Sequence, residues 1–445
     1  MTHGAIFPKL VKFAVPLILS SVLQLLFNAA DIIVVGHYAG DNSLAAVGST
    51  SSLINLLVNV FLGLGVGCNV VAANFLGAEK KEELNRTVHT AVVLSFLGGV
   101  FLTVIGVAFS RQILILMSSP QNVLPLSTIY LKIFFSGITA SVVYNFGAAL
   151  LRAKGDTKRP LYILLVAGLI NVILNLIFVV FFKMDVAGVA FATVLSQVFS
   201  AACVLFILSK EEDEFRLEFR RLRLDREILR RIVKIGLPAG FQGMLFSFSN
   251  MIIQSSVNSF GEIMVAGNAA AQSIEGFIYI SMNSFAQGTL TFASQNMGAH
   301  KFGRIKRLVV IAEFVVVAVG LFLGFAALLF GKALLGIFSP SQIVVEAGML
   351  RLSVILITYF TCGMMDCMAS AIRGMGHSVM PMIVTLVGAC GLRMIYIFTF
   401  FQIPRFHTFR SIFYSYPLSW VVTFLFLTAS FVWVMKKIGH DDKDS

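Results

Sequence analysis

Asp31 is the acidic residue whose surroundings are the least suited to a charge. It lies in Phe27-Asn28-Ala29-Ala30-Asp31-Ile32-Ile33, inside an apolar run that covers residues 10–35. The nearest other charge in sequence is Asp41, beyond that run. A carboxylate in such surroundings is costly unless it has a partner or a function. It could bind Na⁺ or carry a proton. The alternative is a carboxylate at the water-facing end of a helix.

Two amides and a hydroxyl could join Asp31 in one site. Asn171 and Asn175 are four residues apart, so they share one face of a helix, and Thr193 lies in the next apolar run. At ~1.5 Å per residue, Asn175 and Thr193 lie about 10 Å from the outer ends of their runs, and Asp31 about 8 Å. Four oxygen-bearing side chains at similar depth predict a site for Na⁺ or a proton, with no cofactor. Hydrogen bonding between helices is the alternative for the amides.

Three further ionisable residues lie in apolar runs of the second half of the chain: Glu275, Asp366 and Arg393. The helical rise separates Asp366 and Arg393 by roughly 8 Å in depth, which permits an ion pair without requiring one. We interpret these residues as a local polar network, with substrate contact as the alternative. Arg393 is the one deep cation that the sequence indicates, and Lys132 is a second candidate nearer an outer end.

Two prolines at matching places in the repeat lie inside apolar runs. Pro16 precedes Asp31 in the first run, and Pro238 occupies the matching place in the seventh. A proline removes one helical hydrogen bond and kinks the helix. Such a kink could couple ion binding to the shape of a cavity, or it could be static.

The composition requires lipid as the main solvent. Among 445 residues, 58% are hydrophobic and 13% charged, and the mean hydropathy is +0.89. Soluble proteins are about 45–50% apolar and about 25% charged. Because a membrane helix needs roughly 20 mostly apolar residues, we predict twelve spans. Their limits are 10–35, 44–76, 88–109, 127–151, 161–182, 187–209, 236–260, 265–297, 308–330, 349–371, 381–402 and 412–435.

The net charge of +12 is explained by topology rather than by a nucleic-acid partner. The basic residues lie between the spans, mostly in alternate connections and at the termini. This bias predicts a multi-pass protein of the plasma (inner) membrane with both termini in the cytoplasm.

The chain repeats itself. Lys12-Phe13-Ala14-Val15-Pro16 matches Lys234-Ile235-Gly236-Leu237-Pro238, and Leu151-Arg152-Ala153-Lys154-Gly155 matches Ile372-Arg373-Gly374-Met375-Gly376, at shifts of 222 and 221 residues. We therefore predict an all-α polytopic membrane protein with two six-helix bundles, 1–209 and 236–445, joined by a cytoplasmic linker, 210–235. Six spans per repeat give both bundles one orientation, so a pseudo-two-fold axis should run along the membrane normal.

The sequence has no motif that would make it an enzyme. It lacks G-x-x-x-x-G-K-[ST], H-E-x-x-H and G-x-S-x-G, so neither an ATP-binding phosphate loop nor a catalytic centre of these types is indicated. The five cysteines have no C-x-x-C spacing, which gives no sign of a disulfide framework or a zinc site.

These repeats, with the Leu151-Arg152-x-x-Gly155-Asp156 segment and the stretch from Val186 to Thr193, resemble the multidrug and toxic compound extrusion (MATE) family of bacterial type. The resemblance covers nearly the whole chain. It implies export of organic cations and amphipathic compounds, driven by H⁺ or Na⁺. The family's functional positions fall on Pro16, Gln24, Asp31, Asn171 and Thr193, and Glu275 resembles a glutamate of some members. Where several prokaryotic members have a second aspartate, this chain has Asn175.

We therefore expect a monomeric exporter that works by alternating access, with small amphipathic or cationic substrates and membrane lipid as its partners. Asp31, Asn171, Asn175 and Thr193 would hold the coupling ion, Na⁺ included. The alternative is a flippase for lipid-linked precursors, which would need a cationic cavity, and a membrane-embedded enzyme is a third, weaker reading.

Overall fold

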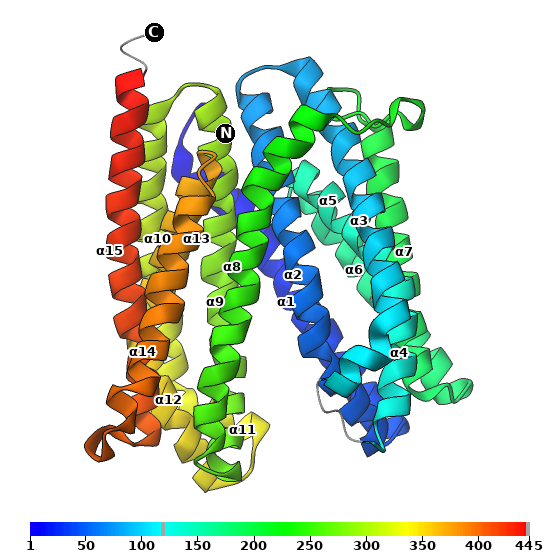
Figure 1. Cartoon of the computed structure of the whole chain (residues 1–445), viewed down its shortest axis with the longest axis vertical. Helices are drawn as coiled ribbons and strands as arrows, with labels where there is room; N and C mark the ends of the chain where they lie inside the picture. The colour runs from blue at the N-terminus through cyan, green and yellow to red at the C-terminus, as the bar shows by residue number, and fades with distance from the viewer. Residues whose placement is uncertain (117–120, 442–445) are drawn as a thin grey trace. The chain divides into compact units, whose positions relative to one another are not determined.

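The computed structural model describes residues 1–116 and 121–441, most of which are helical. Figure 1 shows the helices in chain order. They are α1 (Ile6–Tyr38), α2 (Asp41–Gly77), α3 (Lys81–Leu116), α4 (Leu124–Ser136), α5 (Ile138–Lys154), α6 (Lys158–Asn175), α7 (Asp185–Lys210), α8 (Arg226–Asn258), α9 (Glu262–Gly298), α10 (Phe302–Leu329), α11 (Gly331–Phe338), α12 (Gln342–Gly374), α13 (Val379–Thr385), α14 (Leu392–Phe398) and α15 (Phe409–Asp441).

The described helices account for the predicted spans. Within residues 1–116 and 121–441, nine helical segments are long and apolar enough to cross a membrane, and the pair α4 and α5 makes a tenth. The helices α8 and α9 have 33 and 37 residues and are more polar, and they cover the seventh and eighth predicted spans. The prediction of an all-α polytopic membrane protein is confirmed.

The fourth span is broken, which the sequence prediction of one run over 127–151 did not include. The helices α4 and α5 meet at an angle of 46° around Gly137. A Cβ at Gly137 would lie 2.4 Å from Val194 of α7, so the backbone passes close to that side chain. The bend therefore lies where α7 packs against the junction.

Contacts divide the chain into two compact units. The N-terminal unit is Pro16–Gly240, and the C-terminal unit combines Met1–Val15 with Phe241–Ser445. The divisions fall inside α1 and α8, directly before Pro16 and shortly after Pro238. The domain limits at 209 and 236 follow from the sequence repeat and stay a prediction.

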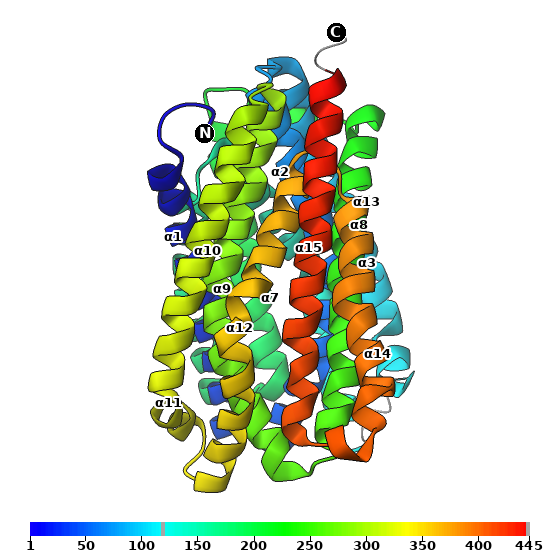
Figure 2. The same ribbon diagram turned by 90° about the vertical axis from the view of Figure 1, so that its left-hand side faces the viewer.

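Each unit is a helical bundle with its own packing. In the N-terminal unit, α5 lies against α2, α3 and α7, and α6 against α7. In the C-terminal unit, α12 packs against α9, α10 and α15 (Figure 2). The first residues of the chain belong to the second bundle, because Phe13 meets Phe292 edge to face and Lys301 Nζ donates to Thr2 O at 3.1 Å.

The first half of α8 packs against α2 through glycines. A Cβ at Gly63 would lie 2.2 Å from Gly240 N, and one at Gly67 would lie 2.4 Å from Ile232 O. Gly63 and Gly67 are four residues apart, as are Gly236 and Gly240, which is the spacing that lets two membrane helices approach at backbone distance. This contact explains why α8 up to Gly240 belongs to the N-terminal unit.

The backbone repeats as the sequence does. Three pairs of residues with positive φ are each separated by 221 positions: Gly40 and Gly261 (82° and 89°), Glu79 and His300 (57° and 55°), and Gly155 and Gly376 (100° and 90°). Glu79 and His300 are not glycines, so they adopt a conformation that is uncommon for their residue types. Matching turns at one spacing support duplication of a six-helix unit.

Candidate functional site

The predicted cation residues form one hydrogen-bonded network in the N-terminal unit. Asn175 Nδ2 donates to Asp31 Oδ1 and, at 3.3 Å, to Asn171 Oδ1. Asn171 Nδ2 donates to Thr193 Oγ1 at 3.4 Å, and Thr193 Oγ1 donates to Val189 O at 3.0 Å. The network joins α1, α6 and α7, as the spacing and depth of these residues predicted. Their role in cation coupling stays a prediction.

A glycine on α6 determines how closely α1 approaches. A Cβ at Gly168 would lie 1.8 Å from Phe27 Cε2, so no other residue fits at this position without moving that ring. Phe27 and Asp31 are four residues apart and share one face of α1. The contact between Phe27 and Gly168 therefore helps to hold the Asp31 carboxylate against α6.

The network borders a cavity of about 240 Å³. Gln24, which was expected from the family resemblance, lies in its wall with Asp31. Several polar wall residues were not singled out from the sequence: Asn28, Ser141, Asn145, Ser196 and Gln197. Their helical spacing could have indicated them, since Ser141 and Asn145, like Ser196 and Ser200, are four residues apart and share a face.

In the part of the chain that the structure describes, two buried oxygens at this site have no hydrogen-bond donor. Asn175 Oδ1 and Gln197 Oε1 have no partner among the described residues. An acceptor buried without a donor is unfavourable unless a water or a cation satisfies it. One carboxylate with amide and hydroxyl oxygens is a donor set suited to a hard monovalent cation, or to a proton held by Asp31.

Glu275 forms a buried ion pair that the sequence did not reveal. Its partner is Arg351, whose Nε and Nη2 donate to the two carboxylate oxygens, each at 2.7 Å. Arg351 Nη1 donates to Asn268 Oδ1 at 2.8 Å, and its guanidinium lies over Tyr416 and Phe413. The prediction that Arg393 was the one deep cation is wrong, because Arg351 is buried as well. The sequence did not indicate this burial, since Arg351 lies near the start of its apolar run and is covered by residues of α9 and α15.

Arg393 and Asp366 have other partners. Arg393 Nε donates to Ser419 Oγ at 2.9 Å, and its guanidinium is 4.3 Å from the ring centre of Tyr416. Asp366 lies beside Tyr279 and Asn283 of α9. Glu275, Asp366 and Arg393 thus make their direct contacts with other residues, although all three lie around Cys362. Their interpretation as a local polar network stays a prediction.

Glu313 of α10 is a second acidic residue that was missed. Both of its carboxylate oxygens are buried beside Cys367, without a hydrogen bond of good geometry among the described residues. Pro16 and Pro238 lie inside α1 and α8 as predicted. Ser20 Oγ donates to Pro16 O at 2.8 Å, a contact of the kind that accompanies bent helices.

Comparisons with known proteins give one consistent result. A probable multidrug resistance protein of Bacillus subtilis, YoeA, is 28% identical over 435 residues, covering 96% of this chain and 94% of that protein. Another from the same organism, YpnP, is 30% identical over 298 residues, covering 67% and 66%. A solved outward-facing structure of a multidrug resistance MATE family transporter of the MOP superfamily matches with a TM-score of 0.90 and 21% identity, over 99% of this chain and 97% of that one.

The family model matches both repeats. It covers residues 16–177 and 238–399, the two segments that the internal duplication defines. The starting points are Pro16 and Pro238, and the first segment includes the Asp31 network except Thr193. The chain therefore belongs to the MatE family, whose members are membrane transporters and not enzymes.

Proposed function

We propose that this protein is a secondary active multidrug exporter, which moves organic cations and amphipathic compounds out of the cell by exchange for H⁺ or Na⁺. The observation that carries the proposal is the network of Asp31, Asn171, Asn175 and Thr193 beside a cavity of about 240 Å³. A single buried carboxylate among neutral oxygens is a group whose charge a cation can cancel.

The ion acts by changing which state of the cavity is favoured. Binding at Asp31 neutralises the carboxylate and tightens the contacts of α1 with α6 and α7. The cavity shares Asp31 with the network, so a bound cation changes the charge that a cationic substrate meets there. Because coupling free energy is reciprocal, a substrate that the ion displaces must in turn weaken ion binding. Alternating exposure of the cavity to the two sides completes the exchange.

The substrate class is supported by the cavity wall and by the names of the relatives. Phe27 and Tyr144 provide aromatic surface, and Asp31 provides negative charge. The relatives are named as probable multidrug resistance proteins. A flippase for lipid-linked pyrophosphates would need unpaired cations in its cavity. Arg351 is neutralised by Glu275, and Arg393, which contacts Ser419 and Tyr416, is not in the wall of the cavity beside Asp31.

The test is transport by purified protein in liposomes. Release of a fluorescent lipophilic cation is measured with a pH gradient alone and with a Na⁺ gradient alone, for wild type, Asp31→Asn and Glu346→Gln. Glu346 is an exposed carboxylate of α12 and serves as the control. We expect one gradient to drive transport in wild type and in the control, and Asp31→Asn to abolish it.

Each outcome separates the alternatives. Transport driven by one gradient names the ion. Full transport by Asp31→Asn would remove Asp31 from the mechanism. Folded wild-type protein that responds to neither gradient, but moves a fluorescent lipid-linked pyrophosphate between leaflets, would establish the flippase instead.

A further inference from the structure

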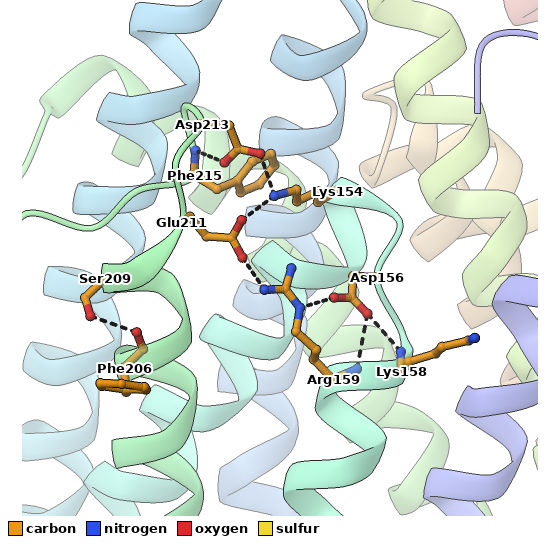
Figure 3. A network of polar contacts seen from close by, with 9 residues as sticks. All are labelled: Lys154, Asp156, Lys158, Arg159, Phe206, Ser209, Glu211, Asp213 and Phe215. Atoms are coloured by element: carbon orange, nitrogen blue, oxygen red, sulfur yellow. Dashed lines mark hydrogen bonds and ion pairs between the residues drawn. The ribbon is translucent and has the colours of Figure 1, made fainter.

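The connection between α7 and α8 is docked on the N-terminal unit rather than free (Figure 3). Glu211 and Asp213 pair with Lys154 of α5, and Glu211 also pairs with Arg159 of α6. Phe215 and Leu217 are buried. The start of this segment is therefore held by ion pairs at the ends of two membrane helices. We call residues 211–225 the strap.

The strap is tied again further along. Glu214 pairs with Lys81 at 2.7 Å, and the backbone N–H of Glu218 donates to His89 Nε2 at 3.1 Å. At its far end the Asp225 N–H donates to Thr90 Oγ1 at 3.1 Å. Residues 219–224 thus form a short loop whose two ends are fixed on α3.

These contacts separate the charges of the connection. Four of its acidic side chains, Glu211, Asp213, Glu214 and Asp225, pair with basic residues of the helices, whereas Glu212 is exposed. Its arginines, in contrast, do not pair with the helices that the structure describes. Arg216, Arg220 and Arg223 are exposed and form no ion pair within residues 1–116 and 121–441, and Arg221 pairs only with neighbouring Glu218 at 3.0 Å.

Large apolar side chains alternate with these arginines on the loop. Phe219, Leu222 and Leu224 are 57%, 39% and 43% exposed. The connection begins at the end of α7, a helix long and apolar enough to cross a membrane, where Lys210 Nζ lies 5.8 Å from the centre of the exposed Phe206 ring. Lysines at the ends of spans extend toward the lipid headgroups, so we expect the connection to begin at that level.

We infer that residues 216–224 form a docking surface for anionic phospholipid headgroups, with Phe219, Leu222 and Leu224 inserted among the lipids and Arg216, Arg220 and Arg223 on the phosphates. Unpaired arginines next to exposed apolar residues are the combination that holds a segment at an anionic membrane surface. Both ends of the loop are fixed on α3, through His89 and Thr90, so lipid bound at the loop also stabilises the position of that helix.

The test uses full-length protein with Leu222→Trp as a reporter in detergent. Brominated phosphatidylglycerol or brominated phosphatidylcholine is added, and quenching of the reporter is compared with that of the protein lacking it. The charge variant is R216Q/R220Q/R223Q, and the control is K80Q/K306Q/R307Q. The control removes three exposed basic residues that also form no ion pair among the described residues.

We expect phosphatidylglycerol to quench at a lower concentration than phosphatidylcholine. The charge variant should weaken this binding on the order of 100-fold, since each arginine near an anionic surface contributes about five-fold. The control should still be quenched at a lower concentration of phosphatidylglycerol than of phosphatidylcholine. A variant in which Phe219 and Leu224 are replaced by serine should lose quenching without loss of folding.

Three results would overturn the inference. They are equal quenching by the two lipids, equal losses in the charge variant and the control, and full competition by soluble glycerol phosphate. The last result would identify free phosphate rather than lipid as the ligand. The replaced side chains are exposed, so thermal unfolding should change little, and Arg220→Gln alone provides a milder variant with the same expected direction.

Discussion

The buried pair of Glu275 and Arg351 gives the sharpest quantitative prediction. The two residues are 5% and 3% exposed, so the energetics of buried rather than surface ion pairs apply. Glu275→Gln keeps the shape of the side chain but places an NH₂ group against a guanidinium donor. It removes one of three charge-assisted hydrogen bonds of Arg351, and it leaves the guanidinium without a counter-ion. We expect a loss of about 3–5 kcal/mol in unfolding free energy.

The partner variants distinguish a structural pair from a functional acid. Arg351→Met should cost less, because a lone carboxylate can take up a proton whereas a lone guanidinium cannot lose one. Glu275→Leu combined with Arg351→Met should lie within about 2 kcal/mol of wild type, since apolar replacement of both partners is often neutral.

The measurement is reversible unfolding in mixed micelles, followed by tryptophan fluorescence. Trp420 is a suitable reporter because its ring centre is 5.5 Å from that of Tyr416, over which Arg351 lies. Liposome transport is measured on the same variants. A double variant as unstable as the sum of Glu275→Leu and Arg351→Met, each measured alone, would refute the ion-pair account. A stable double variant without transport would instead give Glu275 a role in the transport cycle.

Two further predictions follow from close contacts. Gly168→Ala should displace Phe27, destabilise the protein by about 1–3 kcal/mol and reduce transport. The control Gly276→Ala, with open space around its Cβ position, should change neither the unfolding free energy nor the transport rate. The Lys81 ammonium holds the pKa of the Glu214 carboxyl below its usual value. This contribution to strap docking is present above the unfolded pKa and is lost as pH falls through the lowered folded pKa. Hydrogen exchange of residues 214–218, corrected for its intrinsic pH dependence, should therefore accelerate there, and unchanged protection, or the same profile in Lys81→Gln, would contradict it.

The fold was largely predictable because its signals are local. Apolar runs, alternating charge and matched segments 221 or 222 residues apart are all visible in the sequence, and the backbone turns at Gly40 and Gly261 reproduce the same spacing. The break at Gly137 was not visible. The side chain packed against this junction, Val194, is distant in sequence and belongs to α7.

The candidate site was partly predictable for the same reason. Asn171 and Asn175 share a helix face, so their joint position follows from spacing alone. Asp31 and Thr193 were added because they lie at a similar distance from the outer ends of their spans. The burial of Arg351 and Glu313 depends on neighbouring helices, which the sequence does not order in space. The docking of Glu211, Asp213 and Glu214 likewise depends on the positions of Lys154 and Lys81 in the folded protein.

The division of α1 and α8 between the units has a consequence for synthesis of the protein. Gly63 and Gly67 of α2 pack against Gly236 and Gly240, so the N-terminal unit has all its parts only after the ribosome has passed residue 240. Met1–Val15, which are synthesised before α2 to α8, belong to the same unit as the helices that follow residue 240. A chain cut within 218–224 would therefore yield two fragments that each lack a segment of their own bundle, and we expect them to insert stably only when they are produced together.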